Sequence, residues 1–221
     1  MGFTGFGEHA IDFYDGLEAD NSKSYWEDNK HVYAEDVRAP MEALLAELSD
    51  FVDESSRVAV FRPYRDVRFA RDKTPYKTHC GGVIEAGRGA GAYYVEVGSA
   101  GLRVGGGCFH LQADQVARFR SAVDGELHGK ALEVLVGRLE RGGWGIHGER
   151  LKTKPRGFEG DHPRIELLRH RSLYAMKVWE PDDVLHERGT LDRVRKGFRA
   201  LRGINEWARD HVGVSELPRR R

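Results

Sequence analysis

The chain has 221 residues, 40% of them hydrophobic and 32% charged, which is enough apolar material for one core beneath a well-solvated surface. Its 35 Lys and Arg residues balance 35 Asp and Glu residues. This neutrality argues against a dedicated nucleic-acid-binding protein, because such domains are usually basic. No run approaches the roughly 18 apolar residues of a membrane-spanning helix, and no signal-peptide pattern opens the chain, so we expect a cytoplasmic protein of one domain.

The first 55 residues are predicted to be mainly helical. Apolar residues recur at helical spacing over 11–17 and again over 25–52, and Ser22 between the two stripes suits an N-cap. Pro40 interrupts the second stripe. Because proline is tolerated in the first turn of a helix and not in its interior, this stripe predicts either two helices or a helix that begins near Pro40.

Residues 58–110 change character and are predicted to form a sheet. Short alternating runs rich in Val, Phe and Tyr are separated by glycine-rich turns, and the connections are too short to hold crossover helices. Such strands pair as antiparallel hairpins, which makes the fold class α+β. The predicted strands are 58–61, 82–85, 93–97 and 102–104, with turns at 87–91 and 98–101.

The rest of the chain alternates between helix and strand. The predicted elements are helices at 113–123, 126–140 and 191–208, and strands at 144–153 and 172–179. An irregular loop covers 154–163, and a basic tail at 215–221 is predicted to be disordered. We therefore predict one α+β domain over residues 1–214, in which amino-terminal and carboxy-terminal helices flank an antiparallel sheet.

Residues 62–79, between the first two predicted strands, contain four Arg and two Lys but only two Asp. Guanidinium groups provide forked donors that match phosphate and carboxylate, and tyrosine rings can orient a ligand. This composition predicts a pocket for a phosphorylated or carboxylated small molecule. Its predicted binding residues are Arg62, Arg65, Asp66, Arg68, Asp72, Lys73, Tyr76 and Lys77, together with Arg156 of the loop at 154–163.

A structural interpretation of the same segment stays open. Asp66 and Asp72 each lie within three residues of two or more cations, so the segment could be an ion-pair network that holds an irregular connection in place. Exposed pairs of this kind contribute only about 0–1 kcal/mol each.

Asp66 and His79 are the candidates for acid–base chemistry. The sequence identifies no cofactor or nucleophile and does not decide whether the protein is an enzyme.

Cysteine and histidine usage predicts neither a disulfide nor a metal site. Cys80 and Cys108 form no Cys-x-x-Cys pair and are each expected to be small buried side chains. The ten histidines are scattered singly, without metal-ligand spacing. His162 could join His79 in proton transfer, although a histidine outside a metal site is more often a hydrogen-bonded structural residue.

The segment at 65–77, Arg-Asp-x-Arg-Phe-x-x-Asp-Lys-x-Pro-Tyr-Lys, resembles the hallmark of a bacterial family classed as a domain of unknown function, which also occurs within longer fungal proteins. Further points of resemblance are Trp26-x-x-Asn29-Lys30, Tyr93-Tyr94, a Gly105-Gly106-Gly107 turn, and Pro155-Arg156-Gly157-Phe158 with His162-Pro163. The resemblance covers most of the chain. It implies no activity, cofactor or catalytic residue, but a polar motif of this kind favours a site over a scaffold.

Three classes of function remain open. The first is a small-molecule site at 62–79, with or without catalysis. In the second, the same segment binds an acidic segment of a protein partner. The third is association with nucleic acid through the tail at 215–221 and a basic face of the last helix, for which an ordinary solvated face is the preferred interpretation. The residues of that face are Arg193, Lys196, Arg199 and Arg202.

Overall fold

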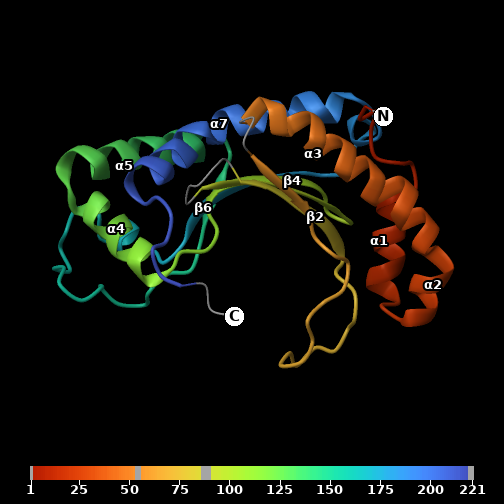
Figure 1. Cartoon of the computed structure of the whole chain (residues 1–221), viewed down its shortest axis with the longest axis horizontal. Helices are drawn as coiled ribbons and strands as arrows, with labels where there is room; N and C mark the ends of the chain where they lie inside the picture. Colours follow the sequence, from red (N-terminus) through yellow and green to blue (C-terminus); the bar gives the residue numbers. More distant parts are fainter. Residues whose placement is uncertain (1, 53–55, 86–90, 219–221) are drawn as a thin grey trace. The chain divides into compact units, whose positions relative to one another are not determined.

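The computed structural model describes residues 2–52, 56–85 and 91–218. Its strands form one six-stranded antiparallel sheet in the order β1-β2-β3-β4-β6-β5, accompanied by amino-terminal and carboxy-terminal helices (Figure 1). The α+β fold predicted from the spacing of the hydrophobic runs is confirmed. Cys80 and Cys108 are both buried and unbonded to one another, as expected from their isolation in the sequence.

The chain divides into two compact units, each assembled from three segments. The first unit comprises Met1–Ile84, Tyr94–Val104 and Val178–Lys196. The second comprises Glu85–Tyr93, Gly105–Lys177 and Gly197–Arg221. The predicted domain boundaries at residues 1 and 214 stay a prediction.

The amino-terminal helices of the first unit follow the two apolar stripes of the sequence. Ser22 is the N-cap of the second helix, where its hydroxyl accepts a hydrogen bond from the backbone N–H of Tyr25 at 3.1 Å. Figure 1 shows the first two helices side by side. The helical elements are α1 (Ala10–Ala19), α2 (Lys23–Val32), a π-helical stretch (Tyr33–Arg38) and α3 (Ala39–Val52).

Pro40 lies in the first turn of α3, directly after the π-helical stretch. The backbone N–H of Ala39 donates to the carbonyl of Ala34, five residues earlier, as expected at the end of a π-helix. The helical chain is thus continuous through the proline, because the missing N–H falls where the helical register changes. The sequence predicted either two helices or a helix that begins near Pro40, and the second alternative fits the position of Pro40 in the first turn of α3. The π-helical stretch was not predicted.

The predicted hairpin strands are β1 (Arg57–Val60), β2 (His79–Glu85), β3 (Ala92–Gly98) and β4 (Gly101–Cys108). At the turn between β3 and β4, Gly101 has a φ of +91°, and a Cβ there would collide with the carbonyl oxygen of Trp179. The predicted turn at Gly105-Gly106-Gly107 is wrong, because these residues continue β4. Of the predicted turn at 87–91, only Gly91 falls among the described residues.

The elements that complete the chain match the helical predictions more closely than the strand predictions. The predicted strand at 144–153 is wrong over most of its length, since only three of its residues pair with β6. Gly148, with a φ of +137°, turns the chain away from the sheet. The elements are α4 (Ala113–Asp124), α5 (Glu126–Arg141), β5 (Gly145–His147), α6 (Ile165–Leu168), β6 (Leu173–Trp179), a 3-10 turn (Asp183–His186) and α7 (Gly189–His211).

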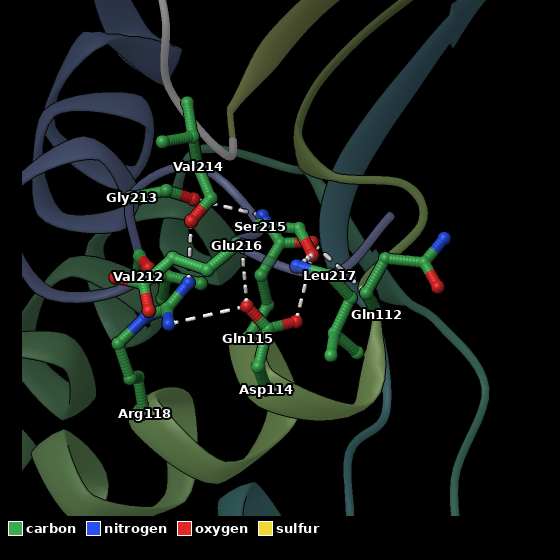
Figure 2. Close-up of polar contacts among 10 residues, drawn as sticks. All are labelled: Gln112, Asp114, Gln115, Arg118, Val212, Gly213, Val214, Ser215, Glu216 and Leu217. Atoms are coloured by element: carbon green, nitrogen blue, oxygen red, sulfur yellow. Dashed lines mark hydrogen bonds and ion pairs between the residues drawn. The ribbon is translucent and has the colours of Figure 1, made fainter. Parts of the chain in front are cut away.

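The residues after α7 pack against the start of α4 in the second unit (Figure 2). The Arg118 guanidinium donates to the carbonyl oxygens of Val212 and Val214, each at 2.6 Å, and so satisfies backbone groups that the end of α7 leaves unpaired. Asp114 accepts hydrogen bonds from the Ser215 hydroxyl and the Glu216 N–H, each at 2.8 Å. The first residues of the predicted disordered tail therefore have defined partners, while 219–221 lie outside the described residues.

Candidate functional site

The basic segment leaves the sheet after β1 and returns to β2 as a hairpin-like arm, defined here as residues 61–78 (Figure 1). An isolated antiparallel bridge between Tyr64 and Tyr76 joins its two sides, with backbone hydrogen bonds from the Lys77 N–H to the Pro63 carbonyl and from the Arg65 N–H to the Pro75 carbonyl, each 2.8 Å long. Because only a few backbone hydrogen bonds bridge the arm, its conformation depends mainly on contacts made by its side chains.

The base of the arm is anchored by Tyr76. Its ring stacks on Trp26 of α2, with centroids 4.5 Å apart and planes 9° apart. The side chain of Asn21 contacts the backbone of Tyr76 twice, accepting from its N–H at 3.0 Å and donating to its carbonyl at 3.2 Å. This double contact fixes the position of the residues on either side of Tyr76 relative to α1 and α2.

Arg65 and Asp72 brace the middle of the arm. The Arg65 guanidinium forms an ion pair with Asp72 and donates to the hydroxyl of Thr74. Asp72 also accepts from the Thr74 backbone N–H at 2.9 Å. This hydrogen bond, together with those from Arg65 and the Thr74 hydroxyl, lowers the pKa of Asp72 to about 2. The charge of Arg65 is thus already compensated within the arm.

The cations nearer the tip of the arm also have internal partners. Arg68 donates twice to Asp66, at 3.0 and 2.7 Å, and these contacts lower the pKa of Asp66 to about 2. The Lys73 ammonium donates to the carbonyl oxygen of Val67 at 2.8 Å. The ion pairs that the sequence offered as the structural interpretation are therefore present. The side chains of Asp66, Arg68 and Lys73 do not line the pocket beside the arm.

A cavity of about 420 Å³ opens between the arm and the connection from α1 to α2. Acidic and basic side chains both contribute to its wall, and all of its residues belong to the first unit. The lining residues are Glu18, Asn21, Arg65, Asp72, Thr74, Tyr76, Lys77, Thr78 and His79. The structure thus brings together four of the predicted binding residues (Arg65, Asp72, Tyr76 and Lys77) and the acid–base candidate His79.

Lys77 differs from the other cations of the arm. Its ammonium lies 5.3 Å from the centre of the Phe61 ring, and no carboxylate within 2–52, 56–85 or 91–218 forms an ion pair with it. Partial burial, reinforced by the charge of Arg62, lowers the pKa of Lys77 from its ordinary value. Lys77 is therefore a partly desolvated cation on the pocket wall, without a carboxylate partner among the residues that the structure describes.

A charged cluster that sequence reasoning missed adjoins the pocket. Its centre is Glu96 on β3, which is only 8% exposed. One carboxylate oxygen of Glu96 accepts from the Tyr94 hydroxyl at 2.6 Å, and the other accepts from Arg103 on β4 at 3.1 Å. The imidazole Nε2 of His79 on β2 lies 3.7 Å from the same carboxylate. Three neighbouring strands thus contribute to one polar cluster that includes a residue of the pocket wall.

The alternation of side chains along β2 separates this cluster from the helical core. Cys80 is buried and faces Tyr33, whereas its neighbour His79 is half-buried on the opposite face of the sheet. Burial lowers the pKa of His79, and the charges of Lys77 and Arg103 lower it further, against the opposing effect of Glu96. Burial and these two cations thus favour the neutral imidazole.

The remaining predicted site residues lie away from the wall of this cavity. Arg62, in the arm, is exposed and contributes through its charge near Lys77. Arg156 is exposed in the second unit. In the same unit Lys154 pairs with Glu159 at 2.9 Å, and His162 lies 3.2 Å from Asp124. The cavity is formed without any residue of the loop at 154–163.

Over the described ranges of the chain, none of the helices combines the length and the apolar character needed to cross a lipid bilayer. No curated protein matches the chain in sequence. Residues 9–207, which include the arm and the cluster around Glu96, match the model of a family described as conserved hypothetical protein (DUF2461), and the chain therefore belongs to this family.

Proposed function

We propose that the protein binds a small anionic molecule, phosphorylated or carboxylated, in the pocket beside the arm, with Lys77 as the residue that holds the anion. The observation that carries the proposal is the state of Lys77: partly buried, on the pocket wall, and not paired with a carboxylate in the described parts of the chain. A desolvated cation attracts an anion more strongly than a hydrated one, because the local dielectric constant is lower.

The internal ion pairs of the arm give a second argument. Arg65 is neutralised by Asp72, so it acts on a ligand as a positioned donor rather than as a net charge. Tyr76, fixed by Trp26 and Asn21, supplies a rigid edge of the pocket. Under this proposal the two interpretations of the segment are compatible, because the ion-pair network holds the arm in the shape that exposes Lys77 to the pocket.

The proposal predicts a ligand-dependent thermal shift that requires Lys77. A ligand at 100 times its dissociation constant stabilises the native state by about 2.7 kcal/mol, which for a chain of this size raises the melting temperature by roughly 5–10 °C. The measurement is thermal unfolding of wild type and Lys77→Met against inorganic phosphate, sugar phosphates, nucleotides and dicarboxylates. Methionine keeps the apolar stem over Phe61 and removes only the charge.

Arg71→Met is the matched control, since Arg71 is an exposed cation of the same arm that lines no part of the pocket. We expect the active compound to shift wild type and Arg71→Met equally and to leave Lys77→Met unshifted. Equal shifts in all three proteins would place the anion elsewhere, and no shift in any of them would refute the proposal for these ligand classes.

We propose, as a second candidate function, that the tip of the arm docks onto an acidic protein partner. The supporting observation is Phe69, a large aromatic side chain that is 98% exposed. The nearby Arg71 and Lys73 are exposed cations without a carboxylate partner in the described residues. An aromatic anchor beside exposed cations suits a partner surface that combines an apolar recess with acidic residues.

The docking function predicts that Phe69→Ser abolishes retention of a partner without loss of stability. Affinity capture with wild type, Phe69→Ser and Leu127→Ser would identify candidates, and each purified candidate would then be titrated against the three proteins. Leu127 is the control because it is an exposed apolar residue of α5, 76% accessible. We expect a loss of affinity of about tenfold or more for Phe69→Ser alone. Equal binding by the Phe69 and Leu127 variants would contradict docking through the arm.

A further inference from the structure

We infer that the pocket takes up a proton when it binds its anion, that His79 accepts this proton, and that the preferred ligand therefore has two negative charges, as a phosphate monoester or sulfate has. The inference rests on the proposed function, because it assigns a proton and a ligand charge to the same pocket. It concerns residues of the wall and of the adjoining sheet, all of which belong to the first unit.

Burial lowers the pKa of the His79 imidazole, and two opposing charge effects act on it as well. The Glu96 carboxylate, 3.7 Å from its Nε2 atom, favours the protonated ring. Lys77 and Arg103 are close enough for their charges to disfavour it. The pocket wall also includes Glu18 from α1, together with Asp72, whose charge is taken by Arg65. The charge state of the ring is thus set by a balance among fixed groups.

Glu96 cannot change this balance by moving. Both of its oxygens are occupied, one by the Tyr94 hydroxyl at 2.6 Å and the other by Arg103 at 3.1 Å, and its side chain is largely buried. The geometry of the Glu96 carboxylate beside His79 is therefore built into the sheet. A ligand in the pocket acts on this balance through Lys77, which lines the same wall as His79 and whose charge a bound anion would compensate.

An anion bound at Lys77 cancels the repulsion between Lys77 and a protonated His79. It also adds an attraction of its own, so the pKa of the imidazole rises on binding. The wall and the adjoining cluster carry a net positive charge once His79 is protonated, because four cations (Arg65, Lys77, Arg103 and His79) face three carboxylates (Glu18, Asp72 and Glu96). Coulomb attraction to this net charge grows with the charge of the ligand, so a dianion gains more from it than a monoanion does. A monocarboxylate would therefore bind more weakly.

Isothermal titration calorimetry with inorganic sulfate tests the inference. Sulfate remains a dianion between about pH 5 and pH 8, the range in which histidine titrates, so any proton taken up belongs to the protein. Titrations near pH 6.5 in two buffers of different ionisation enthalpy measure that uptake. We expect uptake of a fraction of one proton by wild type and none by His79→Gln, with acetate binding more weakly than sulfate.

The pH dependence of the affinity provides a second measurement. A rise of about one unit in the pKa of His79 on binding corresponds to at most a tenfold change in affinity. We expect sulfate to bind about fivefold to tenfold more tightly near pH 5.5 than near pH 8 in wild type, and equally at both in His79→Gln. In wild type alone, the imidazole resonance of His79 should titrate at higher pH when sulfate is present, which needs no variant.

The outcomes separate this inference from the function on which it rests. Sulfate binding that depends on Lys77 but shows no proton uptake, or uptake that persists in His79→Gln, overturns the inference and leaves anion binding standing. Tighter binding of acetate than of sulfate overturns the assignment of a dianion. The absence of binding by every anion tested, at every pH, refutes both.

Discussion

Replacing Trp26 with alanine is expected to lower the free energy of unfolding by about 3–5 kcal/mol, the usual cost of removing a large buried aromatic side chain. Trp26 is 5% exposed and contacts the rings of Phe13 and Tyr33 as well as Tyr76, on which it stacks. The substitution therefore opens a cavity within the helical core and removes the surface that holds the base of the arm. Urea denaturation measures the loss.

The same substitution is expected to release the arm before the rest of the protein unfolds. Limited trypsin digestion reports this directly, because the arm contains six Arg and Lys residues. We expect cleavage within residues 62–77 to be faster in Trp26→Ala than in wild type, and close to wild type in Trp26→Phe, which preserves a stacked ring. Unchanged cleavage in a destabilised Trp26→Ala protein would show that Asn21 alone anchors the arm.

The second large effect is expected at Arg164, a guanidinium that is only 6% exposed. It donates to the carbonyl oxygens of Val123 at 2.7 Å and Asp124 at 3.0 Å, which end α4, and it forms an ion pair with Glu126 at 3.2 Å. Arg164→Met leaves these carbonyls without a donor in a site that water does not easily reach. We expect a loss of about 3–5 kcal/mol, as for other broken buried charge contacts.

The control for Arg164 is Arg171→Met. Arg171 forms an ion pair of 2.8 Å with Glu149, but both side chains are more than half exposed, so the pair should contribute less than about 1 kcal/mol. Urea denaturation of the two variants side by side tests the role of burial. Similar losses in both proteins would show that the carbonyls at the end of α4 find other partners when the guanidinium is removed.

The elements that local sequence determines were predicted well. The stripe of apolar residues over 25–52 and the N-cap Ser22 specify helices by contacts within four residues along the chain, so no knowledge of the tertiary structure is needed. The strand predicted at 144–153 failed for the opposite reason. Its pattern is apolar enough for a strand, but its extent depends on where β6 offers a partner and on the positive φ of Gly148.

Part of the charged cluster around Glu96 could have been predicted from the sequence. The turn at Ser99-Ala100 places Glu96 and Arg103 at equal distances on either side, so a hairpin centred there pairs the two residues. Counting from the predicted turn would have found this ion pair. It would not have found the contact of Glu96 with His79, because the register between β2 and β3 depends on a connection of more than two residues.

The sequence by itself determined the fold class, the helices, and the segment of the chain where charged and aromatic residues gather. The sequence could predict ion pairs such as the one between Asp66 and Arg68, because two residues of separation leave few possible geometries. Only the tertiary structure decided which cations of that segment are already neutralised and which are not. Arg65 pairs with Asp72, whereas Lys77 lies over the ring of Phe61 and faces the pocket. Burial and charge compensation are properties of neighbours in space, and these follow from how the arm packs and not from composition.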